Sequence, residues 1–238
     1  MAPQSCAFPV LLTRPAAQSD RFAQDLRNRF PWVRTLVSPL MEATFLHPPL
    51  PLRDWAGVIF TSETGVQSAM RIAADRAAWP ELAFCVGDQT ARVAREAGFQ
   101  AVSAQGDGMA LARMIRARQV NGPLLYLHGE EIRVDLAQIL NAAGIETMGA
   151  ISYRQNARAL TEAAVTELRG QTPVIAPVFS ARTGKLLADE YARIAGTAPL
   201  LVVGISAAAC ADLPATERRI ARQPDATTLL EAMGEWLT

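Results

Sequence analysis

Short apolar runs alternate with segments of helical periodicity along almost the whole chain, and this alternation limits the fold more than any other feature. Between most of the runs, apolar residues recur three and four positions apart. Strands that alternate with helices of this length predict parallel βαβ units in a doubly wound α/β sheet. Three helical segments are followed by Gly98, Gly144 and Gly196, as expected of helix C-terminal caps. The expected strands are 8–13, 33–39, 57–62, 83–87, 100–104, 123–129, 146–153, 174–180, 199–206 and 218–222.

Three landmarks occur twice, in the same order. The sequence FTSETG at 60–65 resembles FSARTG at 179–184, and VGDQTA at 86–91 resembles VGISAA at 203–208. Asp107 with Leu111 likewise resembles Asp225 with Leu229, and each second copy lies 117 to 119 residues after the first. An ordered series at nearly constant offset predicts two related α/β domains.

We do not expect the two domains to be consecutive along the chain. The first predicted strand precedes the first landmark, and the proline-rich segment 36–52 between them predicts an extended crossing. Residues 146–160 offer a symmetrical place to cross back. We therefore expect one discontinuous domain (1–36 plus 157–238), one inserted domain (52–147) and two linker strands (37–51 and 148–156).

Composition excludes several classes of function. Formal net charge is zero and no basic block occurs, which argues against a nucleic-acid partner. Neither a dinucleotide-binding glycine motif nor a phosphate loop follows any predicted strand. His47 and His128 are the only histidines, and Cys6, Cys85 and Cys210 lack metal-ligand spacing, so no metal site is expected. Without a leader-like segment or an apolar stretch of about 20 residues, we expect a soluble cytoplasmic protein with no membrane partner.

Hydroxyl-bearing residues gather where predicted strands become helices. Such residues are good helix N-caps, and the backbone N–H groups at a helix start also attract anions. Because ligands of parallel sheets bind beyond the carboxyl ends of the strands, these junctions are expected to line a cleft between the domains. The candidates are Thr61, Ser62, Thr64, Thr90, Ser180 and Ser206, with Gly87, Gly129 and Gly204 for close backbone approach, Arg14, Arg133, Arg154 and Arg182 near strand ends, and Tyr153 on the returning linker.

Each candidate also has a structural interpretation. A hydroxyl can serve only as a helix cap, an arginine can belong to the solvated surface, and Tyr153 can be an aromatic plug at a hinge. The functional interpretation depends on the whole set converging on one place.

The motifs resemble those of the uroporphyrinogen III synthase family over nearly the whole chain. Because the family's sequences diverge greatly, the number, order and spacing of the motifs carry the resemblance. The matching segments are LLTRP (11–15), VIFTSETGV (58–66), CVGDQTARVAREAG (85–98), GDGMALARMI (106–115), LLYLHGEEIRVDLAQILNAAGI (124–145), ISYR (151–154), VFSARTG (178–184), VVGISAAA (202–209) and PDATTLLEAM (224–233).

The resemblance implies two α/β domains joined by a two-stranded linker, with the active site in the cleft. It implies a lyase that takes hydroxymethylbilane, a linear tetrapyrrole with eight carboxylates, removes its hydroxyl as water, inverts ring D and closes the macrocycle. It also implies that no metal or organic cofactor is used. A monomer that receives its substrate from hydroxymethylbilane synthase is a further expectation.

The resemblance carries over to individual residues. Tyr153 matches the tyrosine that is the family's best candidate for assisting hydroxyl loss. Substrate-binding positions are matched by Thr61, Ser62, Thr90, Gly129, Arg133 and Ser180. One position departs from the pattern, because Ser206-Ala207 stands where many members have two threonines, so Ala207 cannot donate a side-chain hydrogen bond.

One alternative of another class remains, a non-catalytic two-domain sensor or carrier of an anionic small molecule. An assay of the product isomer separates the two hypotheses.

Overall fold

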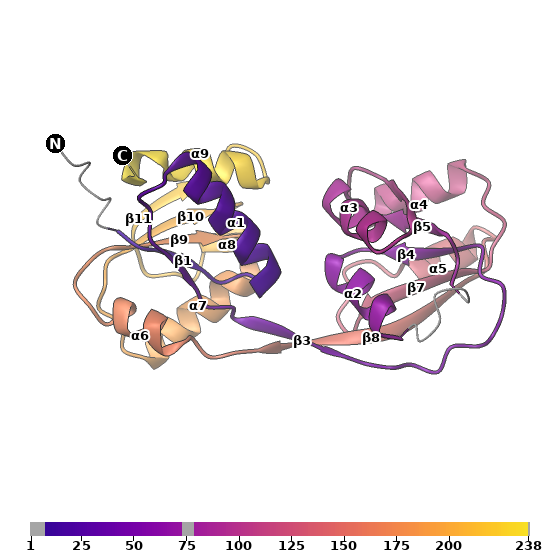
Figure 1. Ribbon diagram of the computed structural model, residues 1–238, viewed down its shortest axis with the longest axis horizontal. Coiled ribbons are helices and arrows are strands. Elements are labelled where there is room, and N and C mark those ends of the chain that lie inside the picture. The colour runs from indigo at the N-terminus through magenta and orange to yellow at the C-terminus, as the bar shows by residue number, and fades with distance from the viewer. Residues whose placement is uncertain (1–7, 73–78, 238) are drawn as a thin grey trace. The chain divides into compact units, whose positions relative to one another are not determined.

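A computed structural model describes residues 8–72 and 79–237 of the chain (Figure 1). The chain divides into two compact units. The first unit comprises Met1–Glu42 and Asn156–Thr238, and the inserted unit comprises Ala43–Gln155. Each unit contains a parallel sheet with helices on its faces, so the predicted α/β class is confirmed.

The sheet of the first unit has the order β2-β1-β9-β10-β11, and every neighbouring pair is parallel. Numbered by chain order within this unit, the sequence of strands is 2-1-3-4-5, which is the arrangement of flavodoxin-like doubly wound sheets. The strands are β1 (Val10–Leu12), β2 (Thr35–Val37), β9 (Val174–Val178), β10 (Leu200–Gly204) and β11 (Ala215–Ile220).

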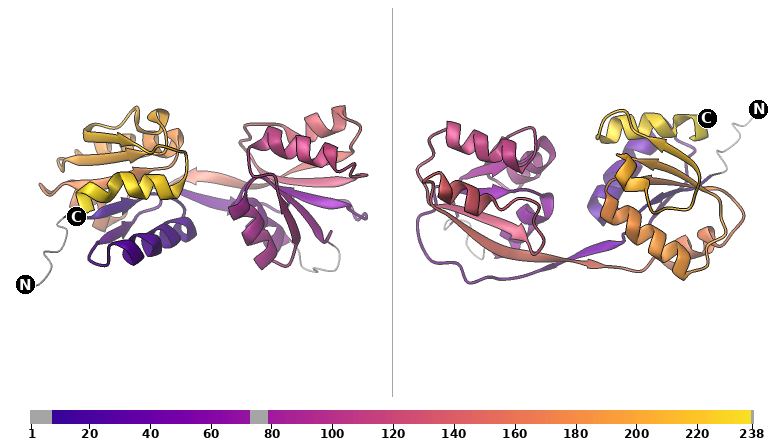
Figure 2. Two further views of the ribbon diagram at one scale, coloured as in Figure 1. Left: turned by 90° about the horizontal axis from the view of Figure 1, so that it is seen from above. Right: turned by 180° about the vertical axis from the view of Figure 1, so that it is seen from behind.

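Helices cover both faces of this sheet, as the views in Figure 2 show. Leu11 belongs to one apolar core and Leu12 to the other, because successive side chains of a strand point to opposite faces. Burial on both faces explains why the central strands β1, β9 and β10 are continuous apolar runs rather than alternating ones. One core includes residues of α6 (Glu162–Leu168), α7 (Ala181–Arg193) and α8 (Ala207–Cys210), and the other includes residues of α1 (Ala16–Arg29) and α9 (Ala226–Leu237).

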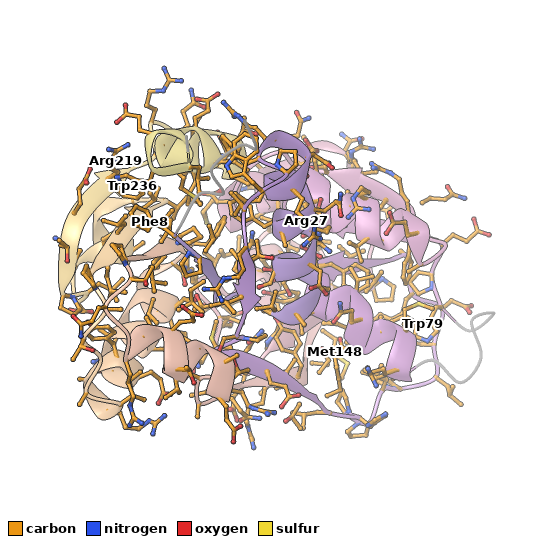
Figure 3. The ribbon with its side chains drawn as sticks, turned by 60° about the vertical axis from the view of Figure 1, so that its left-hand side comes forward. Phe8, Arg27, Trp79, Met148, Arg219 and Trp236 are labelled. Atoms are coloured by element: carbon orange, nitrogen blue, oxygen red, sulfur yellow. The ribbon has the colours of Figure 1, made fainter. Side chains whose placement is uncertain are left out.

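Polar contacts add to the packing of α9 on this sheet. The Arg219 guanidinium of β11 lies 4.3 Å from the ring centroid of Trp236 on α9, and both side chains are labelled in Figure 3. The same guanidinium donates a hydrogen bond to the backbone oxygen of Ala232 at 3.2 Å. A partly buried arginine thus joins the edge strand to the last helix.

The inserted unit has the strand order β3-β8-β7-β4-β5-β6, in which the pairs from β8 to β6 are parallel. One face carries α2 and α3 and the other carries α4 and α5, each with its own apolar core. The strands are β3 (Met41–Phe45), β4 (Gly57–Phe60), β5 (Leu82–Cys85), β6 (Gln100–Ser103), β7 (Leu124–Gly129) and β8 (Thr147–Ala157). The helices are α2 (Glu63–Ile72), α3 (Asp88–Glu96), α4 (Gly108–Ala117) and α5 (Leu136–Ala142).

The strand β3 is part of the segment that the prolines predict to be extended, and it pairs with β8. The Leu46 N–H donates to the Ser152 oxygen at 2.9 Å, and the Arg158 N–H donates to the Leu40 oxygen at 2.9 Å. Residue numbers therefore rise along one strand as they fall along the other, so the pairing is antiparallel.

The sequence repeat corresponds to a repeated structure. The segments β4-α2, β5-α3 and β6-α4 occupy the same places in their sheet as β9-α7, β10-α8 and β11-α9 occupy in theirs. Asp107 accepts a hydrogen bond from the Ala110 N–H at 2.8 Å, and Asp225 accepts one from the Thr228 N–H at the same distance. The landmark aspartates are therefore equivalent helix caps. Of the remaining strands, β7 corresponds to β1 and β8 corresponds to β2. Because β7 and β8 come last in the inserted unit whereas β1 and β2 come first in the other, the two units are related by a circular permutation.

Two of the three predicted glycine caps adopt the expected left-handed backbone, Gly98 with φ 89° and Gly144 with φ 80°. The third prediction is wrong in detail. At the end of α7 the left-handed residue is Ala195, with φ 51°, and the next N–H, that of Gly196, donates to the Tyr191 oxygen. Gly196 is needed for another reason, because a Cβ there would lie 2.5 Å from the Tyr191 ring.

Two cysteines are buried, and burial raises the pKa of the Cys85 thiol to about 12. Cys6 lies outside the described residues. Within the described ranges, no helix combines the length and the apolar character required to span a bilayer.

Two glycines inside helices of the first unit are expected to respond oppositely to a methyl group. A Cβ on Gly184 of α7 would overlap the carbonyl oxygen of Ala209, whereas a Cβ on Gly234 of α9 has Phe30 at 3.9 Å as its nearest neighbour. We expect Gly184→Ala to lower the free energy of unfolding by about 2 kcal/mol or more. Gly234→Ala should raise it by about 0.5–1 kcal/mol, the difference in helix propensity. Urea unfolding measures both, and equal effects would contradict the close packing of α7 on α8.

Candidate functional site

The order of strands in the inserted unit creates a switch point between β4 and β7. From β4 the chain continues toward β5 on one side, and from β7 it continues toward β8 on the other. Connections that diverge in this way leave a crevice at the carboxyl ends of the two strands, where open α/β sheets bind ligands. Thr61 and Ser62 follow β4, and Gly129 ends β7.

Tyr153 of β8 meets Ser62 at this edge. The phenol oxygen of Tyr153 lies 2.9 Å from the Ser62 hydroxyl, and that hydroxyl also accepts the Gly65 N–H of α2 at 3.1 Å. The Ser62 oxygen thus caps α2 while its single proton is available to the Tyr153 oxygen. With Ser62 as donor, the phenol proton is left for a further acceptor. Tyr153 is only 7% exposed, so the pair is held in a largely buried setting.

Gly129 is required by the tyrosine ring. A Cβ at this position would lie 2.7 Å from the Tyr153 Cε2 and 3.1 Å from its hydroxyl oxygen. The Glu130 N–H donates to the Tyr153 carbonyl at 3.0 Å, which fixes the backbone beside it. The sequence predicts Gly129 as a place where backbone approaches a ligand, but the structure gives it a packing reason.

Thr61 contacts a residue that the sequence pattern does not single out. Its hydroxyl lies 3.4 Å from the phenol oxygen of Tyr126, in the middle of β7. Burial raises the pKa of Tyr126, the hydrogen bond with Thr61 partly offsets this rise, and the charges of Tyr153 and Asp135 add to it. The His128 ring packs against the Tyr126 ring, with 4.6 Å between the ring centroids and an angle of 37° between the planes. The signal for Tyr126 in the sequence is a hydroxyl between the leucines of a predicted strand.

The remaining predicted residues of this unit differ in accessibility. Thr64 and Thr90 are 8% and 6% exposed, so both belong to the packing of the first turns of α2 and α3. Gly87 precedes α3, which has no side-chain cap, and a Cβ at Gly87 would meet nothing within 4 Å. Arg133 is exposed between β7 and α5. The structure therefore brings Thr61, Ser62, Gly129 and Tyr153 together and leaves Arg133 at the surface.

Arg154 is engaged in an ion pair. Two of its nitrogens lie 2.8 and 2.9 Å from the Glu130 carboxylate, and this pairing holds the pKa of that carboxyl below its usual range. Its charge is therefore already matched on the exposed face of β8.

The first unit has its own switch point, between β1 and β9. Arg14 follows β1, and its guanidinium lies 4.1 Å from the ring centroid of Phe179, which follows β9. The next residue, Ser180, caps α7 by accepting the Thr183 N–H at 3.1 Å. The corresponding edges of both units thus carry predicted residues, Arg14 with Ser180 here and Thr61 with Ser62 in the inserted unit.

The other two predicted residues of this unit lie at the end of β10. A Cβ on Gly204 would overlap the Cys210 sulfur, so this glycine is explained by packing. Ser206 is exposed at the start of α8 and forms no capping hydrogen bond, unlike Ser62 and Ser180. The Ser62 and Ser180 hydroxyls cap α2 and α7, whereas the Ser206 hydroxyl does not cap α8.

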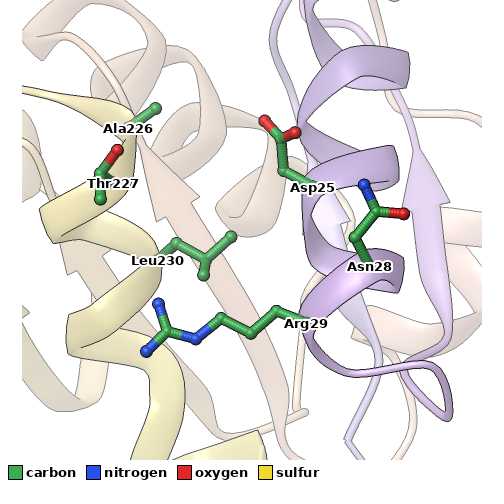
Figure 4. Close-up of a pocket in the computed structure, with 6 residues that line it drawn as sticks. All are labelled: Asp25, Asn28, Arg29, Ala226, Thr227 and Leu230. Atoms are coloured by element: carbon green, nitrogen blue, oxygen red, sulfur yellow. The ribbon is translucent and has the colours of Figure 1, made fainter.

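A pocket of about 510 Å³ lies elsewhere in the first unit, between α1 and α9 (Figure 4). Its polar groups are Asp25, Asn28, Arg29 and Thr227, and no residue predicted for the site lines it. Among the residues that the structure describes, no cluster of three or more His, Cys, Asp or Glu side chains could hold a metal ion.

The sequence model of one protein family, described as "Uroporphyrinogen-III synthase HemD", matches residues 9–231. The chain belongs to the uroporphyrinogen-III synthase family. The resemblance found in the motifs is thereby confirmed, and the match spans both units. No curated protein matches the sequence.

Solved structures of family members align over nearly the whole chain. Uroporphyrinogen-III synthetase from Helicobacter pylori 26695 shares the fold, with a TM-score of 0.65 and 18% identity over 96% of this chain and 99% of that one. A mutant uroporphyrinogen III synthase from Thermus thermophilus aligns at 15% identity with a TM-score of 0.47, over 96% of this chain and 98% of that one.

Substitution by alanine is expected to change the free energy of unfolding differently at Gly129 and at Gly87. We expect Gly129→Ala to lower the free energy of unfolding by about 1–3 kcal/mol, because the methyl group would displace the Tyr153 ring. Gly87→Ala should change it by no more than about 0.5 kcal/mol, since its surroundings are open. Urea unfolding of the two variants provides the measurement. A Gly129→Ala protein as stable as the parent would show that the tyrosine does not need the glycine.

Proposed function

We propose that the protein cyclises hydroxymethylbilane, with loss of water and inversion of ring D, to give uroporphyrinogen III. The family match over residues 9–231 supports the reaction class. The observation that supports the chemistry most directly is the Tyr153–Ser62 hydrogen bond at the switch point of the inserted unit. The proposal includes independence from metal ions and organic cofactors.

Tyr153 is the proposed acid. The terminal hydroxyl of the substrate needs one proton to leave as water, and a positioned phenol can donate it. With Ser62 as the donor, its hydrogen bond to the phenol oxygen lies at the N-terminus of α2, where the helix dipole favours negative charge. When the macrocycle closes, ring D releases one proton and the phenol is restored, so the net loss is one water.

Neutral groups can hold the carboxylates of the substrate. Backbone N–H groups at the starts of helices and nearby hydroxyls bind anions without a net positive protein. Two candidates for such contacts are Gly87 and Ser206, at the starts of α3 and of the four-residue helix α8, where no side chain caps the helix. Folding the substrate so that the substituted carbon of ring D attacks would then supply most of the catalytic effect.

The product isomer decides the proposal. Hydroxymethylbilane, freshly made from porphobilinogen, is incubated with the purified protein in the presence of a chelator, and the oxidised products are separated by chromatography. The unassisted reaction closes without inversion and gives isomer I. We expect catalytic formation of isomer III. Isomer I alone, at the rate without protein, would contradict the enzyme and favour a sensor or carrier.

Tyr153→Phe is expected to lower kcat by about 10- to 100-fold, because the phenylalanine keeps the ring and loses the proton donor. KM should change by less than about threefold, since the ring still fills its place against Gly129. The matched control is Tyr191→Phe. It removes a tyrosine hydroxyl of the first unit that donates to the Ala198 oxygen. Unchanged kcat in Tyr153→Phe would remove the acid role from this residue.

A further inference from the structure

The pairing of β8 with β7 is irregular next to Tyr153. His128 pairs with Ile151, and the following residue, Gly129, pairs with Tyr153, so Ser152 is an extra residue in β8. Alternation along a regular strand would turn Ser152 and Tyr153 to opposite faces of the sheet. Both instead contact the segment of α2, Ser152 through the Ser68 hydroxyl and Tyr153 through the Ser62 hydroxyl. A β-bulge at this point changes the direction of the tyrosine side chain.

A buried pair of hydroxyls fixes the bulge. The Ser152 hydroxyl lies 2.7 Å from the Ser68 hydroxyl of α2, and both residues are fully buried. Ser68 uses its own proton on the Gly65 carbonyl oxygen at 2.6 Å. Because Ser68 gives its one proton to Gly65, the proton between the two serines comes from Ser152, whose hydroxyl also lies 3.4 Å from the His128 carbonyl oxygen.

These bonds close a ring that contains the Tyr153 hydroxyl. Gly65 accepts from Ser68 through its carbonyl oxygen and donates to Ser62 through its N–H. Ser62 contacts Tyr153, which is joined to Ser152 by a peptide bond. Every hydrogen bond of the ring ties one turn of α2 to itself or to the bulge of β8. The distance between the phenol and Ser62 thus depends on the position of the bulge.

We propose that Ser152 and Ser68 are positioning residues for the reaction, which act by holding the bulged strand so that the Tyr153 hydroxyl stays on Ser62. The proposal rests on the role given to Tyr153 under the proposed function. Neither serine contacts the substrate in this account, since both are fully buried.

The kinetic test uses Ser152→Ala in two backgrounds. In the parent protein, Ser152→Ala should lower kcat about fivefold to tenfold and leave KM within about twofold. In the Tyr153→Phe background, Ser152→Ala should lower kcat by less than twofold, because the hydroxyl that Ser152 positions is already gone. The same loss in both backgrounds would overturn the proposal. Thr147→Val is the matched control, since it removes a buried hydroxyl of β8 that donates to the Ile145 oxygen.

A second measurement does not depend on activity. The chain has three tyrosines, so protein labelled with 13C at the tyrosine Cζ gives three resonances that Tyr→Phe variants assign. Ser62→Ala removes a hydrogen bond from the Tyr153 oxygen and should shift its resonance. Ser152→Ala should shift it in the same direction and leave that of Tyr191 in place. A Tyr153 resonance unmoved by Ser152→Ala would overturn the proposal.

The two measurements separate the possible failures. If the parent protein makes no isomer III, the proposed function fails, and the resonance of Tyr153 still tests the positioning. If isomer III is made but the backgrounds show equal losses, only the positioning role fails. Should Ser152→Ala not fold, Ser68→Ala removes the same hydrogen bond from the side of α2 and replaces it in both measurements.

Discussion

Burial of both faces of each sheet decides where polar chemistry can be placed in this protein. In β4, Ile59 belongs to one core while Val58 and Phe60 belong to the other, so the middle of the strand has no room for an unpaired polar group. The hydroxyls of this segment therefore come only after the strand, at Thr61 and Ser62. Since the strands are parallel, their carboxyl ends share one edge, and the divergence of the chain at β4 and β7 opens that edge at a single point.

Much of the fold is predictable because it follows from this burial. Continuous apolar runs mark strands covered on both faces, and the landmark aspartates mark equivalent helix caps in the two units. The end of α7 shows where local signals fail. The sequence places glycine at 196, but the chain reaches its left-handed position one residue earlier, at Ala195, and the glycine accommodates the Tyr191 ring. A glycine in a sequence does not distinguish backbone freedom from a close side-chain contact.

The candidate site is less predictable, for related reasons. Gly129 and Gly204 have the pattern of positions where backbone meets a ligand, but Tyr153 and Cys210 occupy the space beside them. The bulge at Ser152 breaks the alternation on which strand prediction relies, so no pattern in 146–153 indicates that Tyr153 faces α2. Ser68 is one helical residue among others until its partner on β8 is known. Contacts that join α2 to β8 depend on tertiary structure and have no signature in either segment alone.

The circular permutation between the two sheets has a consequence for synthesis on the ribosome. The strands β4 to β8 of the inserted unit follow one another along the chain, so this unit can assemble as soon as β8 has been made. In the first unit, β1 must instead wait for β9, its neighbour in the sheet, which is translated only after the whole inserted unit. Domains generally fold as units while the chain is being made. The nascent protein therefore carries an ordered inserted unit between two incomplete parts of the first. The strands β1 and β2 stay without the rest of their sheet until β9, β10 and β11 have been made.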